Sequence, residues 1–185
     1  NSITNPVLAH AFIVAMEIKP NTNKLNKCDT NILDYYPLLD SYVNNTLAAD
    51  EDGVYFVTNQ VTHDNDGKYK CNKGKLIKLE WDNVKDEISL GFETEYENAG
   101  YRKYGMANVG SGTTPTIFNC KHDPSTKYVT INDNACPRMN ICVYDSFDGD
   151  LLSKTPVFNK MRSCDEASFI GVNGRIVAEN NFGHG

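Results

Sequence analysis

A cysteine and a histidine stand two residues apart at Cys120 and His122, and a thiol and an imidazole could act together as nucleophile and base. Alternate residues of a strand lie on one face, so the two groups could meet there. In an oxidised, secreted domain the same spacing is more typical of a disulfide-bonded cysteine and a surface imidazole. The chain contains no G-x-S-x-G, P-loop, Rossmann glycine or H-E-x-x-H motif. We therefore expect a protein without enzymatic activity.

Metal ligands are also sparse in the sequence. The segment HDNDG at residues 63–67 resembles part of a calcium loop, but Thr62 occupies the place of the first carboxylate and no glutamate follows at the twelfth position. A hairpin turn is the better interpretation. The cysteine pair in CPRMNIC, residues 136–142, matches no zinc knuckle. The histidines share no metal-ligand spacing and are His10, His63, His122 and His184. The sequence predicts no metal and no cofactor.

Six cysteines are spread over most of the chain, namely Cys28, Cys71, Cys120, Cys136, Cys142 and Cys164. An even count of this kind predicts three disulfide bonds and an oxidising, extracellular compartment. Asn44–Asn45–Thr46 is an N-glycosylation sequon, which is consistent with secretion and predicts a solvent-exposed Asn44.

The charge and hydropathy patterns exclude two classes of partner. The formal net charge is −6 and no run of five like charges occurs, so the basic field that nucleic acid or an anionic membrane requires is missing. The longest apolar stretch, residues 6–18, is too short to span a bilayer. It is either the tail of a signal sequence or an ordinary buried strand or helix. We expect neither nucleic acid nor membrane as a partner.

The apolar residues repeat mostly with a period of two, which indicates strands rich in β-branched and aromatic residues. Asp-Gly and Asn-Gly steps between them, at residues 52–53, 66–67, 148–149 and 173–174, favour tight antiparallel hairpins. The predicted strands span residues 53–63, 74–81, 87–96, 115–120, 127–133 and 140–147.

One segment before residue 48 has helical spacing. Residues 30–47 carry Ile32, Leu33, Tyr36, Leu39 and Val43 near a period of 3.6, with Thr30 as a possible N-cap and Pro37 as an interruption. The prediction is one all-β domain over residues 1–185, with a short N-terminal helical segment. Its strands form either an antiparallel up-and-down barrel or a disulfide-stapled sandwich. Residues 1–50 are poorly explained by either.

The segment KYVTINDNACPRMNICVYDSFDGDLLSKTP, residues 127–156, resembles the late strands of lipocalins, of the calycin superfamily, and most of all those of divergent arthropod salivary members. In that family a strand that starts on an aromatic residue runs to a half-cystine. The next hairpin then ends in an apolar pair, a small residue, a basic residue and often a proline. Lys154 would stand where the family carries an arginine over the closed end of the barrel. The family's G-x-W is replaced here by GVY at residues 53–55, and its long final helix is reduced to residues 156–167.

The resemblance implies a barrel that binds a small, largely apolar or amphipathic ligand, such as a lipid, a pigment or a biogenic amine. Strand alternation lets about half of the strand aromatics point inward, and ordinary core packing is the alternative for each. The candidate ligand-binding residues are Tyr55, Trp81, Phe92, Tyr96, Phe118, Tyr128 and Tyr144. Insect relatives imply the disulfides Cys28–Cys136 and Cys71–Cys164, which leaves Cys120 for Cys142.

The alternative function is a secreted interaction module or inhibitor with a filled core, whose loops bind a host or partner protein. The Gly-rich segment at residues 97–115 carries Tyr101, Arg102 and Tyr104, residue types that are enriched in interface hot spots. A flexible lid over a barrel mouth would have the same composition.

Overall fold

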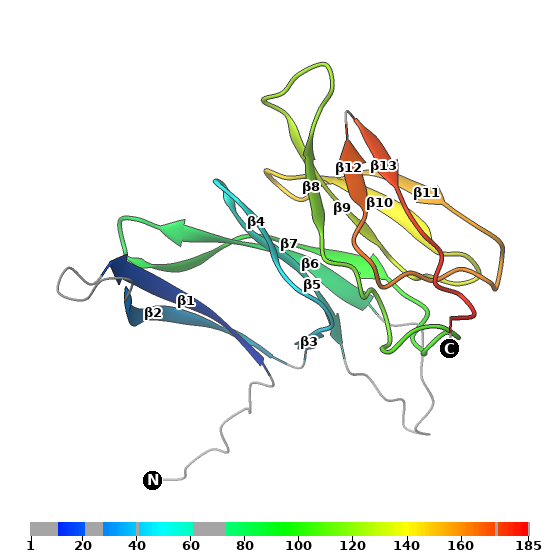
Figure 1. Ribbon diagram of the computed structural model, residues 1–185, viewed down its shortest axis with the longest axis horizontal. Coiled ribbons are helices and arrows are strands. Elements are labelled where there is room, and N and C mark those ends of the chain that lie inside the picture. Colours follow the sequence, from blue (N-terminus) through cyan, green and yellow to red (C-terminus); the bar gives the residue numbers. More distant parts are fainter. Residues whose placement is uncertain (1–10, 21–27, 40, 61–72, 173, 185) are drawn as a thin grey trace, which may run out of the picture.

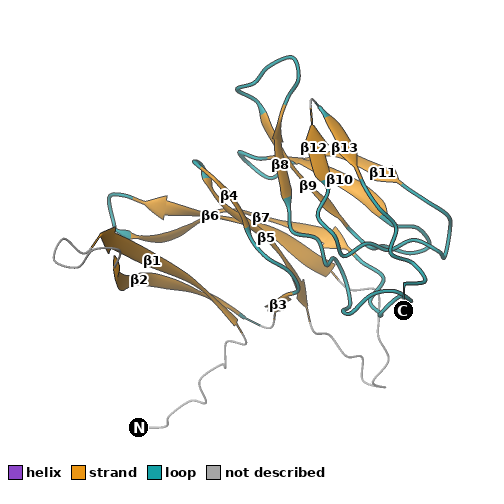
Figure 2. Cartoon of the chain, in the orientation of Figure 1, coloured by secondary structure: helices purple, strands orange, loops and turns teal. Residues whose placement is uncertain are grey.

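The computed structural model describes residues 11–20, 28–39, 41–60, 73–172 and 174–184. These residues form thirteen β-strands and no α-helix (Figures 1 and 2), so the all-β prediction is confirmed. With no helix in the described part of the chain, none is available there that could cross a membrane.

A five-stranded antiparallel sheet lies in the middle of the molecule (Figure 1). Its order is β3-β5-β6-β7, and β4 pairs with the same edge of β5 as β3 does, one after the other along the strand. The strands are β3 (Ser41–Val43), β4 (Ala48–Asp50), β5 (Gly53–Gln60), β6 (Lys73–Asp82) and β7 (Glu87–Glu97).

Two further layers cover the central sheet, one on each face. The antiparallel hairpin of β1 and β2 covers one face, and a four-stranded sheet of order β11-β10-β9-β8 covers the other. A second small hairpin, β12–β13, lies beside β8. The bounds of these strands are β1 (Ala11–Pro20), β2 (Cys28–Leu38), β8 (Thr116–Asn119), β9 (Lys127–Asn132), β10 (Asn140–Asp145), β11 (Leu151–Pro156), β12 (Ile170–Val172) and β13 (Arg175–Val177).

Alternation along β5 creates two separate hydrophobic cores. Val54 and Phe56 point toward the β1–β2 hairpin, where Phe56 packs with Leu38, Ile77 and Leu79. Tyr55 and Val57 point to the opposite face. There they pack with the other members of the larger cluster, which are Leu76, Phe92, Tyr96, Val129, Ile131, Cys142 and Tyr144. Successive residues of a strand face opposite sides, so one short sequence supplies both cores.

The strand predictions from residue 53 onward are confirmed to within a few residues as β5 to β10. The last part of the first predicted strand, residues 61–63, and the turn at residues 66–67 lie outside the described residues. The Asp148–Gly149 turn is present, and Gly149 adopts a φ of 78°, which glycine accepts without strain.

The predicted helix over residues 30–47 is wrong, because this segment forms β2 and β3. Pro37 disfavours a helix interior, whereas an edge strand tolerates it. The apolar run of β1 provides a complete antiparallel partner, with Phe12 opposite Pro37 and Ile18 opposite Thr30. Pairing with a distant strand therefore overrides the local helical spacing.

The described strands form several open sheets, and no closed barrel is detected among them. The core between the central and the four-stranded sheet is built from the inner faces of both, as in face-to-face sheet packing. Lys154 lies on β11, the edge strand, where its amine is 3.3 Å from the carboxylate of the fully buried Asp133.

Gly74 on β6 provides a test of this packing. A Cβ at Gly74 would overlap the ring of Tyr96 and would lie 2.6 Å from the carbonyl oxygen of Thr58. We expect Gly74→Ala to destabilise the protein by about 1–3 kcal/mol, as overpacking does. Chemical denaturation measures the change.

The matched control is Gly91→Ala on β7. There the three atoms nearest to an added Cβ belong to the side chains of Glu80 and Lys78, and none of them is a backbone atom. We expect a change within about 0.5 kcal/mol. Equal effects of the two substitutions would contradict the packing described for Gly74.

Candidate functional site

An open groove of about 860 Å³ lies beside the turn that joins β4 to β5. All three layers contribute to it: β1 of the hairpin, β4 to β7 of the central sheet, and the ends of β9 and β10. Its lining residues are 13–15, 50–54, 78–81, 83, 88, 125–127 and 145–147. We call this feature the acidic groove.

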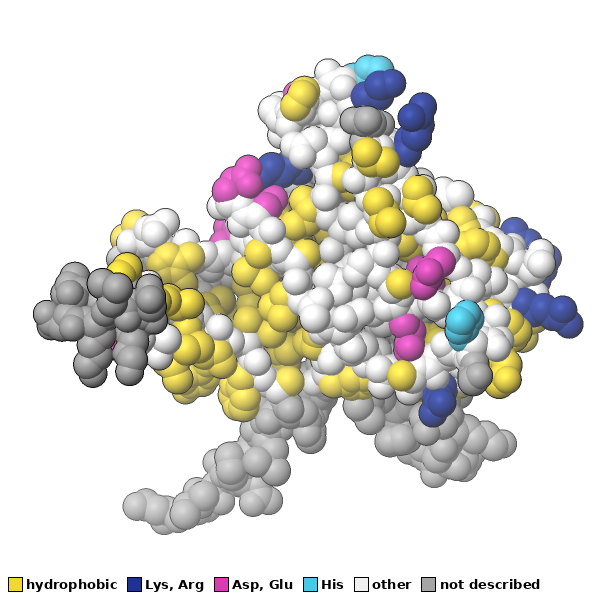
Figure 3. All heavy atoms as spheres, viewed as in Figure 1, with side chains coloured by type: hydrophobic (Ala, Val, Ile, Leu, Met, Phe, Trp, Pro, Cys, Tyr) yellow, Lys and Arg dark blue, Asp and Glu magenta, His cyan; other side chains and the backbone are white. Residues whose placement is uncertain are grey.

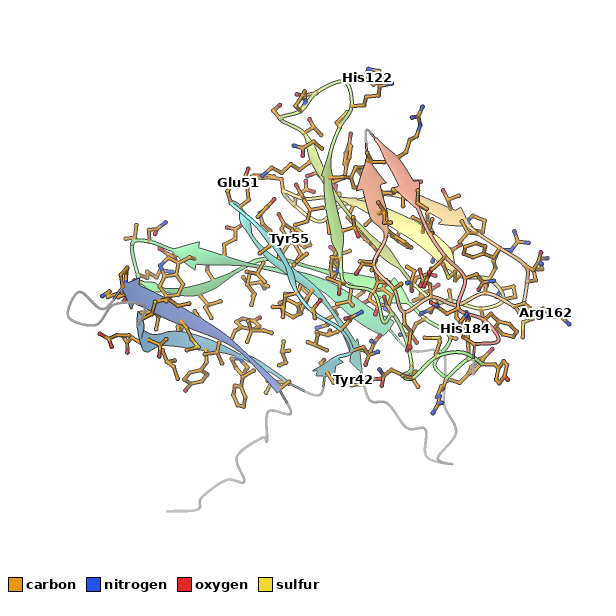
Figure 4. The ribbon with its side chains drawn as sticks, viewed as in Figure 1. Tyr42, Glu51, Tyr55, His122, Arg162 and His184 are labelled. Atoms are coloured by element: carbon orange, nitrogen blue, oxygen red, sulfur yellow. The ribbon has the colours of Figure 1, made fainter. Side chains whose placement is uncertain are left out.

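The ammonium group of Lys127 gathers three carboxylates at the rim of the acidic groove. The Nζ atom lies 3.2 Å from Asp50, 2.7 Å from Glu51 and 2.5 Å from Asp52. Figure 4 shows Glu51 at the tip of the β4–β5 turn. Because Lys127 begins β9, these ion pairs connect the central sheet to the four-stranded sheet.

The Lys127 cluster affects the protonation of its members. Hydrogen bonds from Lys127 lower the pKa of Glu51 and of Asp52, and hydrogen bonds to Asp52 and Glu51 raise the pKa of Lys127. A second lysine, Lys78, is buried, pairs with Glu80 at 2.6 Å and lies 5.7 Å from the centre of the Tyr55 ring. Five carboxylates and two ammonium groups line the groove, so negative charge is in excess.

The groove also has an apolar part. Trp81 is half-buried, and Phe147 is 83% exposed at the end of β10. Other apolar lining residues are Ile13, Val14, Ala15, Val54, Leu79 and Ile88. An apolar surface with an acidic rim can bind a ligand that combines hydrophobic groups with a positive charge.

The structure brings the predicted ligand-binding aromatics to three different places. Tyr55, Phe92, Tyr96 and Tyr144 are buried in the core between the two larger sheets. The Tyr55 and Tyr96 hydroxyls donate hydrogen bonds there, to Ser146 O at 3.2 Å and to Asn59 Oδ1 at 2.6 Å. These side chains fill the space between the sheets.

The other three predicted aromatics lie outside that core. Trp81 lines the acidic groove, whereas Phe118 and Tyr128 pack on each other, 5.5 Å apart, near the β8–β9 turn. Phe118 also lines a smaller pocket of about 480 Å³. Of the seven residues, only Trp81 lines the acidic groove.

Cys120 and His122 do not form a nucleophile and base in the structure. The Cys120 sulfur accepts hydrogen bonds from the backbone amides of His122 and Asp123 and from the Tyr128 hydroxyl, which lower its pKa. The His122 side chain is exposed at the outer tip of the β8–β9 loop (Figure 4), and His184 is exposed near the C-terminus. His10, His63 and the calcium-like segment lie outside the described residues.

The five described cysteines are free thiols in the structure, and Cys71 lies outside the described residues. The structure contains neither a Cys28–Cys136 nor a Cys120–Cys142 bond, and the pairing of Cys28 with Cys136 stays a prediction. Cys120 donates its amide to Thr126, whereas Cys142 pairs with Ile131, five residues further along β9. At about 3.3 Å per residue this is roughly 16 Å along the strand, and a disulfide needs Cα atoms within about 7 Å. The pairing of Cys71 with Cys164 stays a prediction.

Asn44 is half-buried rather than fully exposed. Its Nδ2 atom, to which a glycan would be attached, donates hydrogen bonds to Val109 O at 3.1 Å and to Ser111 O at 3.2 Å. A glycan replaces one of the two Nδ2 hydrogens, so glycosylation would have to break at least one of these bonds. Whether the sequon is used stays a prediction.

The Gly-rich segment at residues 97–115 is fixed against the strands and does not line the acidic groove. Ser111 and Thr113 are buried, and Asn59 and Asn134 bind the backbone at residues 110 and 111. Tyr104 and Arg102 are exposed, so this segment still presents the residue types expected at an interface.

Sequence reasoning missed most of the groove. The signal for the rim was visible as Asp50–Glu51–Asp52 before the predicted turn at Gly53. The partner, Lys127, is 75 residues away from Asp52, and only the packing of the two sheets brings them together. Among the described residues, no group of three or more His, Cys, Asp or Glu side chains could hold a metal ion.

A carboxyl group with a raised pKa lies outside the acidic groove, in a buried polar cluster next to the Gly-rich segment. Asp165 is fully buried, and burial raises its pKa to about 6. Its amide binds Asn134 Oδ1 at 3.0 Å, and its Oδ2 atom has no hydrogen-bond partner. Asp165 lies outside the acidic groove.

Replacing Lys127 tests the cluster at the rim. In Lys127→Met the carboxylates of Asp50, Glu51 and Asp52 repel one another without a neutralising charge. A carboxylate with a lowered pKa contributes stability that is lost as the pH falls through its folded-state pKa. We therefore expect the melting temperature of Lys127→Met to lie below that of the wild type at pH 7. The difference in melting temperature should shrink as the pH falls below the ordinary pKa values of Glu and Asp, which are 4.5 and 3.8.

The control is Lys85→Met, which removes an exposed amine 3.5 Å from Asp82 and 3.6 Å from Glu87. Exposed single pairs contribute little, so its melting temperature should stay near that of the wild type. If Lys127→Met melted below the wild type by the same amount at every pH, the result would argue against electrostatic stabilisation by Lys127.

The raised pKa of Asp165 predicts the opposite pH dependence of stability. Its pKa rises from 3.8 to about 6 on folding, so its protonated form stabilises the folded state at low pH, and this contribution is lost as the pH rises through about 6. We expect Asp165→Asn to be more stable than the wild type at pH 7, by at most about 3 kcal/mol, and less so at pH 4. The exposed turn substitution Asp86→Asn serves as control, and equal pH profiles for the two variants in denaturation experiments would contradict the assignment.

Comparison with known proteins leaves the chain without a family. No protein-family model matches it, and no solved structure matches it. A protein of Archaeoglobus fulgidus described only as uncharacterized is 28% identical over 121 residues, which cover 61% of this chain and 20% of the archaeal protein. The chain therefore matches about one fifth of the length of this relative.

Proposed function

We propose that this chain is an extracellular interaction module whose acidic groove binds an extended, basic and apolar segment of a partner protein. The observation that carries the proposal is the composition of the groove: the Lys127 cluster and Glu80 form an acidic rim, and Trp81 and Phe147 provide apolar contacts. The extracellular location rests on the even number of cysteines in the sequence alone, because the five described cysteines are free thiols in the structure.

The filled core supports a surface site over an internal one. Tyr55, Phe92, Tyr96 and Tyr144, which an internal ligand would have to contact, are packed on one another and on the facing sheet. A groove open to solvent admits a chain that continues on both sides, which an enclosed cavity does not. Lysine or arginine side chains of the partner would meet the carboxylates of Glu51 and Asp52, and its apolar side chains would meet Trp81 and Phe147.

A second candidate function is that of a carrier for a small apolar or amphipathic ligand, with the acidic groove as the binding site in place of a barrel cavity. The groove volume of about 860 Å³ lies within the range of roughly 300–1,000 Å³ that small-molecule sites occupy. A biogenic amine would combine the required positive charge with an apolar body. The two candidates differ in the size of the ligand and share its chemistry.

Trp81 is the sole tryptophan and reports on both candidates. Titration with an extended peptide of alternating lysine and valine should change its fluorescence in a saturable way, and a glutamate–valine peptide should not. Phe147→Ala should weaken binding of the basic peptide by about tenfold, which corresponds to about 1.4 kcal/mol. Rising salt concentration should weaken it further.

The matched control is Val84→Ala, a residue 95% exposed in the β6–β7 turn that does not line the groove. Its affinity for the peptide should equal that of the wild type. Saturable binding of a fatty acid, amine, tetrapyrrole or steroid, with no binding of either peptide, would replace the proposal by the carrier function. Equal binding of the basic and acidic peptides would contradict both.

A further inference from the structure

The β1–β2 hairpin has one face against the central sheet and one face in solvent. The strand register puts directly paired residues on the same face. Ile13 and Tyr36, a register pair, pack on the inner core, and the Asp34 carboxylate accepts a hydrogen bond from the Ile88 amide at 2.8 Å. These contacts attach the hairpin to the central sheet.

The opposite face carries six large apolar side chains that are between 48% and 66% exposed. They are Phe12, Val14, Met16 and Ile18 of β1 and Ile32 and Tyr35 of β2, and we call them the outer hairpin face. Figure 3 shows hydrophobic side chains gathered in the region of this hairpin, at the lower left. Contiguous apolar patches of this kind mark interaction sites on soluble proteins.

A bulge makes the outer hairpin face continuous. Ala15 pairs with Asp34 and Met16 pairs with Ile32, so Leu33 has no partner on β1. Without this extra residue, Ile32 would point to the same face as Asp34. The bulge therefore turns Ile32 outward beside Met16, and Phe12 packs edge-on against Tyr35 at 5.8 Å.

We propose that the outer hairpin face is the interface of a homodimer, in which the hairpins of two copies pack face to face. The face carries no charged residue, because the register puts Glu17, Lys19 and Asp34 on the opposite side. A twofold interface brings each patch against its own copy, so an uncharged patch meets no like charge there although the chain carries a net charge of −6. Two packed sheet faces with interdigitating side chains provide the geometry.

The size of the face agrees with a dimer of moderate affinity. Six half-exposed large side chains present roughly 500–600 Å² per copy. Specific interfaces begin at about 600 Å² per partner. Backbone and the flanking Thr30 and Pro37, which the register puts on the same face, bring the total close to that limit. We therefore expect dissociation in the micromolar range.

Analytical ultracentrifugation of the full chain from about 1 to 200 μM tests the proposal, since this range brackets a micromolar dissociation constant. The wild type should pass from monomer to dimer. Ile32→Lys should weaken dimerisation at least tenfold by placing a charge in the interface. The matched control Leu152→Lys, an exposed leucine on edge strand β11, should dimerise within about threefold of the wild type.

Tyr35→Ser is a second variant that removes apolar area without adding charge, and it guards against a folding defect in Ile32→Lys. Near-ultraviolet circular dichroism and chemical denaturation establish that each variant is folded, independently of any binding in the groove. A wild type that stays monomeric at about 200 μM, or a dimer that survives both Ile32→Lys and Tyr35→Ser, would overturn the proposal.

Discussion

The central strands β5 and β6 are buried on both faces, and this double burial decides where the other strands must pack. Antiparallel sheets commonly keep one face in water, but here Phe56 and Ile77 face one layer while Tyr55 and Leu76 face another. A sheet with two apolar faces needs two covers. The β1–β2 hairpin and the four-stranded sheet supply them, and each is held mainly by the face that it buries.

Beyond the edges of these two apolar layers, buried polar groups hold the structure together through hydrogen bonds. Asn59, near the end of β5, is buried and uses its amide to bind Ser111 and the Tyr96 hydroxyl. Buried amides of this kind must find partners, and the backbone of the Gly-rich segment supplies them. For that reason the segment at residues 97–115 is part of the fixed structure. Its exposed side chains, Tyr101, Arg102 and Tyr104, remain available to a partner.

The acidic groove and the outer hairpin face follow from the same arrangement of layers. The hairpin contributes residues 13–15 to the groove with one part of β1 and presents Phe12 and Ile18 to solvent on its outer face. The Lys127 cluster ties the β4–β5 turn to the opposite layer. A partner in the groove and a second copy on the hairpin would thus occupy adjoining surfaces, which meet at Val14, a residue of the outer hairpin face that also lines the groove.

The strands from residue 53 onward can be predicted from the sequence, because the alternation of apolar and polar residues and the Asp-Gly turns are local signals. The sequence also predicted the turn at Asp52–Gly53 and contains a single tryptophan, Trp81. It could not determine which sheet each strand joins, because Val54 and Tyr55 carry equally apolar side chains and only the packed layers distinguish their faces. The pairing of β1 with β2 was not predicted, because β2 has helical spacing and its strand form depends on contact with β1. Tertiary structure alone brought Lys127 to Asp52 and separated Cys120 from Cys142, since these distances are set by register between strands and not by the chain that connects them.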